Sequence, residues 1–193
     1  MQWALLNGDK NTGVTLFRIA ETLDTGDIAL QKEIKIEERE NAVTLEKKLI
    51  PAGISALEEM ITQIENGKLK EKAQEGTPSY APLLKKEDLK IAWTKSAEEI
   101  DRQIRALVRL GAYSALPNGK ILKIVQAEIL ENNAQESKNP PGEIVGVAKG
   151  KGFIVKCGLR SLLLRRVQLE GKIPTDAWSF LQGSRLKIGE KFL

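Results

Sequence analysis

The sequence predicts an α/β protein in two parts, with a hairpin and helices first and a small OB-like β-barrel second. Three observations point to this arrangement. The charge differs between the halves, the first third combines alternating with helical apolar spacing, and the second half repeats short strand patterns between turns. The 193 residues suffice for two small domains with buried cores. We expect the first domain at residues 1–67, a linker at 68–87 and the second domain at 88–193.

The charge of the chain is unevenly distributed. Residues 1–87 carry 12 basic and 15 acidic side chains, whereas residues 88–193 carry 18 basic and 11 acidic ones. A basic domain beside an acidic one is typical of a protein that binds a polyanion with one half. From charge alone, a basic surface that only keeps the domain hydrated is an equally good interpretation.

Alternating apolar residues near the start of the chain predict a β-hairpin. Thr12–Ile19 and Ile28–Ile36 show the period of two that strands have, and the acidic turn Leu23–Asp27 separates them. Ahead of the hairpin, Trp3–Leu6 is typical of the last turn of a helix, which Gly8 can end in the left-handed conformation.

Residues 41–67 have apolar side chains three and four positions apart, which predicts helix. Pro51 has no backbone N–H and is expected to divide this helix into two pieces near Ile50. The linker that follows is rich in Lys, Gly and Pro and shows no sustained period.

The second domain is expected to open with a helix and continue as strands. Ser96 and Glu99 form a capping-box signature, which predicts a helix from Ser96 to Leu110. Alternating runs separated by turn signals then predict strands over residues 112–116, 120–130, 143–148, 153–157 and 161–169. A short helix is expected over Pro174–Gln182, with proline in its first turn.

The chain contains no histidine and one cysteine, Cys157. A Ser–His or Cys–His nucleophile pair and a zinc site that uses histidine are therefore excluded within these residues. Cys157 lies in an apolar run and is expected to be a packing residue. No apolar run of about 18 residues is present, so no membrane span is expected.

Short motifs in the first domain resemble the catalytic domain of the folate-dependent formyltransferases. In order along the chain they are Asn7-Gly8-Asp9, Thr12-Gly13-Val14-Thr15 and Leu23-Asp24-Thr25-Gly26-Asp27-Ile28. Later segments resemble the linker and C-terminal domain of methionyl-tRNA formyltransferases in particular, among them Thr77–Leu83, Ile100–Leu107 and Phe180–Leu186. The resemblance covers essentially the whole chain and implies that the first domain is the remainder of a Rossmann-like domain.

The resemblance implies transfer of a formyl group from formyl-tetrahydrofolate to the amino group of methionyl initiator tRNA. Attack of the amine on the formyl carbon creates a tetrahedral oxyanion, which needs hydrogen-bond donors and a path for the amine proton. The resemblance assigns proton handling to Asp24, and it places the cosubstrate beside a loop that includes Glu21, Thr22, Leu23, Thr25 and Gly26. Without the resemblance, Asp24 is more simply an ordinary turn carboxylate.

The family's Asn and His fall in a segment ahead of the position of Trp3, and this chain has no counterpart of that segment. An aspartate without these groups has nothing to orient, so we expect the chain alone to be inactive.

Basic side chains of the second domain are the expected contacts to initiator tRNA, because Arg and Lys bind phosphates. The candidates are Arg102, Arg105, Arg109, Lys149, Lys151, Arg165 and Arg166. Glu98 precedes Arg102 by four residues and Asp101 precedes Arg105 by four, a spacing that also predicts ordinary helix ion pairs. Arg109 has no such partner in the sequence.

Two other functions stay open: a tRNA-binding module without catalysis, and a formyltransferase that acts on a sugar-nucleotide amine. The basic second half favours the tRNA enzyme over the latter. We expect a monomer without a bound metal, working in the cytoplasm or in an organelle stroma or matrix.

Overall fold

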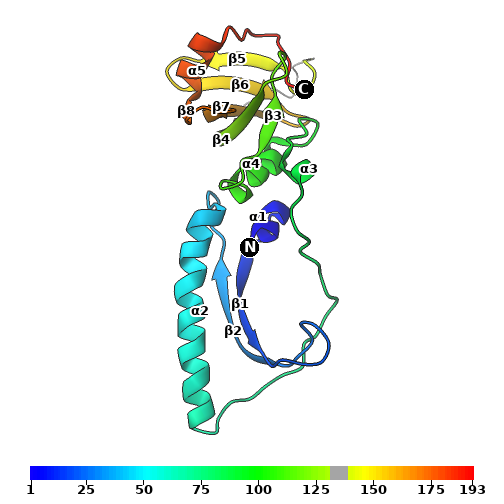
Figure 1. Cartoon of the computed structure of the whole chain (residues 1–193), viewed down its shortest axis with the longest axis vertical. Coiled ribbons are helices and arrows are strands. Elements are labelled where there is room, and N and C mark those ends of the chain that lie inside the picture. The colour runs from blue at the N-terminus through cyan, green and yellow to red at the C-terminus, as the bar shows by residue number, and fades with distance from the viewer. Residues whose placement is uncertain (131–138) are drawn as a thin grey trace.

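The computed structural model describes residues 1–130 and 139–193, and it is elongated, with two parts stacked along the long axis (Figure 1). The lower part in this view holds the antiparallel hairpin of β1 and β2 with a long helix, α2, beside it. Its elements are α1 (Gln2–Asn7), β1 (Asn11–Phe17), β2 (Ile28–Lys35) and α2 (Ala42–Glu65). Gly8 ends α1 with a φ of 76°, which confirms the predicted helix end.

The upper part is a six-stranded antiparallel sheet with helices packed against it. Its elements are α3 (Lys86–Leu89), α4 (Ala97–Ala106), β3 (Tyr113–Ala115), β4 (Ile121–Leu130), β5 (Ile144–Ala148), β6 (Gly152–Lys156), β7 (Ser161–Leu169), β8 (Thr175–Asp176) and α5 (Ala177–Ser184). The predicted strands are confirmed to within a few residues. Within the described residues, no helix is both long and apolar enough to cross a membrane.

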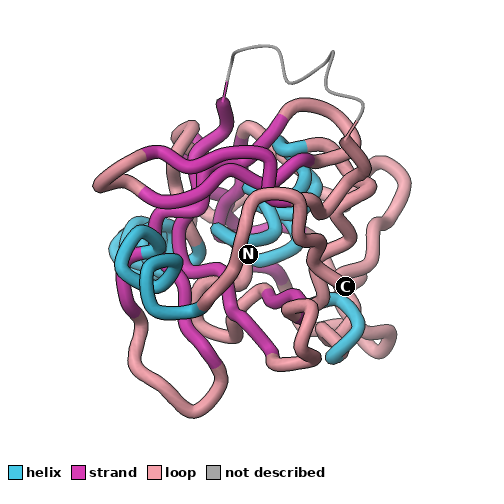
Figure 2. Tube along the Cα trace, turned by 90° about the horizontal axis from the view of Figure 1, so that it is seen from above, coloured by secondary structure: helices cyan, strands magenta, loops and turns pink. Residues whose placement is uncertain are grey.

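The sheet runs in the order β3-β4-β7-β6-β5, and β8 pairs with β7. Register shifts in the β4–β7 ladder bend the long strands. Seen from above in Figure 2, the strands cross at wide angles instead of forming one flat layer. Among the described strands, no pairing joins β3 to β5, so an antiparallel sheet is shown and a closed barrel is not.

The prediction that Pro51 divides the helix is wrong, because α2 runs without interruption from Ala42 to Glu65. A proline removes one donor and bends a helix, but tertiary packing on either side can keep the helix continuous. The side chain of Asn41 caps the start of α2 by accepting from the N–H groups of Val43 and Thr44. Buried Leu45 and Ala56 pack on both sides of the proline and hold the two halves in line.

One face of α2 covers the hairpin, and a second face is apolar and exposed. Five aliphatic side chains spaced three and four apart keep 46–57% of their surface in solvent: Ile50, Ile54, Leu57, Ile61 and Ile64. Contiguous apolar surface of this kind is unusual on a folded protein. We refer to these five residues as the α2 stripe.

Two helices differ from the prediction at their ends. Asp176 caps α5 by accepting from the N–H of Ser179, so this helix begins at Ala177, and Pro174 lies outside it. The capping box of Ser96 and Glu99 on α4 is confirmed, but regular helix ends at Ala106. Both ends are set by caps and turns that the apolar spacing does not report.

A single hydrophobic core connects the two parts. Leu5 of α1 and Leu45 of α2 belong to the same buried cluster as Ile104 of α4 and the interior of the sheet. Deeper in the sheet, Trp93 packs against Phe192 at 5.3 Å between ring centroids and donates its indole N–H to Ser114 Oγ at 2.9 Å. Trp93 is therefore a core residue.

Candidate functional site

The loop between β1 and β2 carries the residues for which the sequence predicts chemistry. Asp24 has a φ of 56°, a left-handed conformation that non-glycine residues other than Asn and Asp rarely adopt. The loop residues Glu21 to Thr25 are exposed. Within the described parts of the chain, no hydrogen bond or ion pair reaches the Asp24 carboxylate, so it is open to a ligand or partner.

Gly26 is the buried residue of this loop. A Cβ atom at this position would lie 1.6 Å from the carbonyl oxygen of Arg18, so no larger residue fits without moving the backbone. The loop closes nearby, where the N–H of Arg18 donates to Asp27 O at 2.9 Å. The predicted sharp turn at Gly26 thus has a steric cause.

A segment of the linker, residues 71–74, binds the loop, and we call this segment the strap. Gln74 Nε2 donates to the carbonyl oxygens of Asp24 at 2.9 Å and Gly26 at 2.7 Å. Glu71 forms an ion pair with Arg18 at 2.7 Å, and this raises the pKa of Arg18. Lys72 adds two backbone hydrogen bonds to Ile28. Sequence reasoning missed Gln74 and Glu71, because roughly fifty residues separate them from the loop and no local pattern marks them.

Arginines of α4 and of the turn that follows it contact the first part of the molecule. Arg105 donates to the carbonyl oxygen of Glu40 at 2.6 Å and to Asp101 Oδ2 at 2.7 Å, which confirms the predicted pair with Asp101. Arg109 has no acidic residue four positions before it, as the sequence indicates, and its partner comes from elsewhere in the fold: it forms an ion pair with Glu46 of α2 at 2.5 Å.

The predicted pair between Glu98 and Arg102 is also wrong. Glu98 forms an ion pair with Arg160 at 2.8 Å. The loop that carries Arg160 approaches the start of α4 only in the folded chain, and sequence spacing along one helix does not report such a neighbour.

Glu40 is the buried acid at this junction. Burial raises the pKa of its carboxyl. The hydrogen bonds from Lys48 and from the N–H of Glu37, together with the charge of Lys48, lower that pKa by more than burial raises it. The pKa of Glu40 therefore lies below the usual value of 4.5. Lys48 Nζ lies 2.8 Å from Glu40 Oε2. The ionised form of Glu40 is therefore stabilised where the two parts meet.

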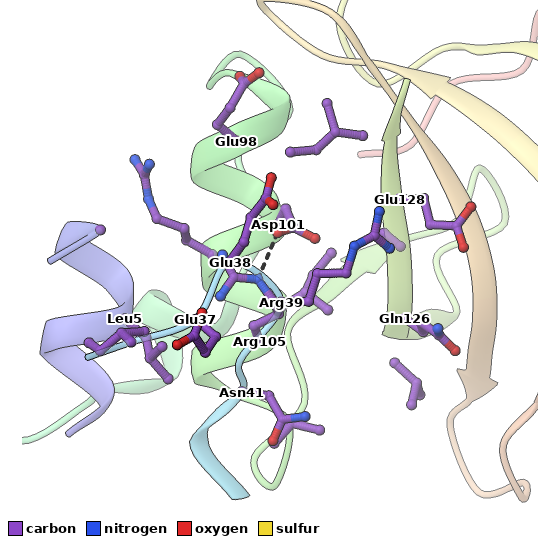
Figure 3. A pocket seen from close by; sticks show the side chains of 18 of the residues that line it. Leu5, Glu37, Glu38, Arg39, Asn41, Glu98, Asp101, Arg105, Gln126 and Glu128 are labelled. Carbon is purple, nitrogen blue, oxygen red and sulfur yellow. Dashed lines mark hydrogen bonds and ion pairs between the residues drawn. The ribbon is translucent and has the colours of Figure 1, made fainter. Parts of the chain in front are cut away.

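A cleft of about 590 Å³ lies between the two parts, walled by α4, by the segment before α2 and by β4 (Figure 3). Arg39 reaches across it toward Glu128 of β4, while Asp101 and Arg105 lie paired on the α4 wall. Its lining mixes both signs of charge. In the described residues, no cluster of three or more His, Cys, Asp or Glu side chains is placed to hold a metal ion.

The remaining basic candidates lie on the sheet. Lys149 and Lys151 are exposed in the turn between β5 and β6. Arg166 is exposed on β7 and lines the cleft, whereas Arg165 lies 3.7 Å from Glu128. The structure brings none of these four to Asp24, because the β1–β2 loop lies at the opposite end of the molecule (Figure 1).

Comparison with known families accounts for both parts of the chain. Residues 83–185 match the C-terminal domain of the formyl transferases, and residues 1–61 match the family's formyl transferase domain that precedes it. The chain belongs to the formyl transferase family. The match to residues 1–61 includes the Asp24 loop, and the match to residues 83–185 includes all seven basic candidates.

Curated formyl transferases align with the chain along its whole length. A protein named methionyl-tRNA formyltransferase from Synechococcus sp. (strain JA-2-3B'a(2-13)) is 37% identical over 100% of this chain and 60% of its own length. One of the same name from Thermodesulfovibrio yellowstonii is 41% identical over 98% of this chain and 59% of its own. The chain thus spans about three-fifths of the length of these relatives.

Solved structures of related fold include HypX from Aquifex aeolicus in complex with tetrahydrofolic acid. It superposes on 98% of this chain and 35% of its own, with a TM-score of 0.68 and 19% identity. At that identity, the likeness establishes the shared fold.

Proposed function

We propose that the chain is the part of a methionyl-tRNA formyltransferase that carries the proton-handling loop and holds initiator tRNA. The observation that carries this proposal is the alignment with enzymes of that name, which continues across both parts of the molecule at 37–41% identity. The sugar-nucleotide alternative is weaker, because the curated relatives that cover the whole chain bear the tRNA enzyme's name.

In this proposal Asp24 acts on the proton of the attacking amine. Its carboxylate is exposed on a loop that Gln74 holds at the carbonyl oxygens of Asp24 and Gly26, so the backbone is fixed while the side chain stays accessible. The chain has no histidine, and any imidazole that Asp24 orients would come from residues beyond these 193. Formyl-tetrahydrofolate would be the cosubstrate beside Glu21 to Gly26.

The second part would hold the tRNA while the aminoacyl end reaches the β1–β2 loop. We infer that the exposed strands and turns of the sheet, including Lys149, Lys151 and Arg166, form the RNA surface of an OB-like domain. We place the domains at 1–67 and 88–193, with the linker at 68–87. The protein would work where translation is initiated, in the cytoplasm or in an organelle stroma or matrix.

The test is a salt titration of binding between the chain and initiator methionyl-tRNA, with formylation measured in the same samples. The variant Lys149→Ala/Lys151→Ala is compared with Lys68→Ala/Lys70→Ala, a matched pair of exposed lysines in the linker. Each lost phosphate contact should reduce the slope of log K against log salt by about 0.7–0.9. This slope should become smaller in Lys149→Ala/Lys151→Ala and should stay unchanged in Lys68→Ala/Lys70→Ala.

We expect binding that weakens steeply with salt and no formylation by the chain alone. Equal binding of initiator tRNA and an unrelated anionic polymer would overturn the tRNA proposal. Formylation by the chain alone would overturn the requirement for residues beyond it. Binding of a sugar-nucleotide amine in preference to tRNA would favour the other enzyme.

A further inference from the structure

Arg102 and Arg105 of α4 and Arg109 in the turn after it, which we call the arginine stripe, face the first part of the molecule, and each meets a different segment there. Arg102 lies against the end of α1, Arg105 binds the segment between β2 and α2, and Arg109 binds α2 itself. Two arginines of α4 and one in the turn after it thus contact three separate segments of the preceding domain. A stripe poised for phosphates would instead point to solvent.

Arg105 is the most enclosed of these contacts. Its Nη1 donates to Glu40 O at 2.6 Å, its Nε donates to Asp101 Oδ2 at 2.7 Å, and its side chain is 19% exposed. The two donors point in fixed directions from one planar group, an arrangement that the ammonium of a lysine does not reproduce. Glu40 is in turn held by Lys48, so the carbonyl that Arg105 binds is itself fixed.

Arg109 and Arg102 extend the contact on either side. Arg109 makes two hydrogen bonds to Glu46, at 3.2 Å and 2.5 Å, although these groups are more exposed than Arg105. A Cβ atom on Gly8 would lie 3.1 Å from Arg102 Cδ, so this arginine lies directly over the end of α1. Its Nε is buried, and no described residue accepts a hydrogen bond from it.

We propose that Arg105 and Arg109 are positioning residues, which fix the basic domain in one orientation relative to the domain that carries Asp24. They contribute nothing to phosphate binding directly. Because the Asp24 loop lies at the far end of the first part, a small rotation about α4 would displace it widely from an RNA held on the sheet. The claim that a displaced Asp24 loop would impair formyl transfer rests on the proposed function. The claim that Arg105 and Arg109 fix the orientation of the two domains does not.

The orientation can be measured without tRNA, as a distance distribution between spin labels on Lys68→Cys, in the linker three residues after α2, and Lys149→Cys in the β5–β6 turn. The native Cys157 is 0% exposed and burial raises its pKa to about 12, so it does not compete for the label. The variants are Arg105→Lys, Arg109→Glu, Glu46→Arg and the charge swap Arg109→Glu/Glu46→Arg. Lys172→Glu, at an exposed residue in the turn after β7, is the matched control.

We expect a narrow distribution in the parent and in Lys172→Glu, and a broader one in Arg105→Lys, Arg109→Glu and Glu46→Arg. The charge swap should restore the narrow distribution, and thermal melts should show that every variant is folded. In tRNA binding, the swap should also return the salt slope to the parent value. A phosphate contact at Arg109 predicts instead that the swap remains about 0.7–0.9 below the parent slope.

Two results would overturn the proposal. The first is a distribution that stays narrow in Arg105→Lys and in both single charge reversals. The second is a charge swap that fails to recover either the distance or the salt slope. If the chain binds no tRNA, the proposed function is contradicted, but the distance measurement still tests whether Arg105 and Arg109 fix the orientation of the two domains.

Discussion

The two parts of the molecule bury their apolar residues to different extents. Of the 26 apolar residues buried in the described chain, four lie in residues 1–67 and the other 22 lie in residues 88–193. Three of those four, Leu5, Ala42 and Leu45, belong to the cluster shared with the second part. The sheet domain encloses its own core. The hairpin and α2 instead bury most of their core residues against the sheet domain, and they leave the α2 stripe exposed to solvent.

This difference shows that regular secondary structure and a complete core are separate properties. The first part has a capped helix of 24 residues and a paired hairpin, yet the five residues of the α2 stripe keep 46–57% of their surface in solvent. A two-stranded hairpin with one helix has too little interior to bury that surface. Substitutions at four places in the molecule test how far the contrast holds.

Phe153→Ala should have the largest effect, because it empties the interior of the sheet domain. The ring is 0% exposed and stacks on Phe192 at 6.4 Å between centroids. Loss of a buried Phe side chain costs about 3–5 kcal/mol. Denaturant unfolding should show this loss, and a cost below about 1 kcal/mol would contradict an enclosed core.

Leu57→Ala provides the comparison in the α2 stripe, where the same experiment should show a loss within about 1 kcal/mol. The side chain is 47% exposed and has little packing to lose. Leu57→Glu/Ile61→Glu should raise solubility and lower binding of a hydrophobic dye. Ile173→Glu, at an isolated exposed residue, serves as the control, and an equal gain there would argue against a contiguous patch.

Gln74→Ala should loosen the Asp24 loop with little effect on global stability. Two hydrogen bonds are lost, each worth about 1 kcal/mol at most in this partly exposed setting. Hydrogen exchange of the amides in residues 18–27 should become faster, while β7 exchanges as before. Unchanged exchange in the loop would show that the strap does not hold it.

Glu40→Gln should produce the smallest loss of stability of the four, and that loss should be present at neutral pH and disappear in acid. The folded state lowers the pKa of Glu40, so the ionised group stabilises the protein above the unfolded value of 4.5, and the contribution is lost as the pH falls through the folded value. As the pH is lowered below 4.5, the melting temperature of the parent should therefore fall more steeply than the melting temperature of the variant. Parallel curves would contradict this role.

The sequence was sufficient for features that depend on neighbours along the chain. The range predicted for the strand Ser161–Leu169 matches β7 at both ends, and the capping box of Ser96 and Glu99 forms as predicted. Alternation and caps are local, and local packing preserves them. The positions of the hairpins β1–β2, β3–β4 and β5–β6 follow from the same signals.

The failures come from contacts that connect distant segments. Arg109 finds Glu46 across 63 residues, and Gln74 reaches Asp24 across 50. Spacing along one helix predicts the partner that lies one turn away, which holds for Arg105 and Asp101 and fails for Arg102 and Glu98. Pro51 belongs to the same group, because buried residues on both sides of it keep α2 continuous.

The route of the linker has a consequence for how the molecule could be divided. It returns from the end of α2 along the hairpin to α3, and Trp3 Nε1 fastens it by donating to Pro82 O at 2.8 Å. The two parts are already joined by a shared core and by the Arg105 contact, so the covalent linker is a second connection between them. A protease that nicks the exposed residues 75–79 should leave a two-fragment protein that purifies as one species. The chain is then a natural starting point for a split protein, whose halves find each other through α1 and α4.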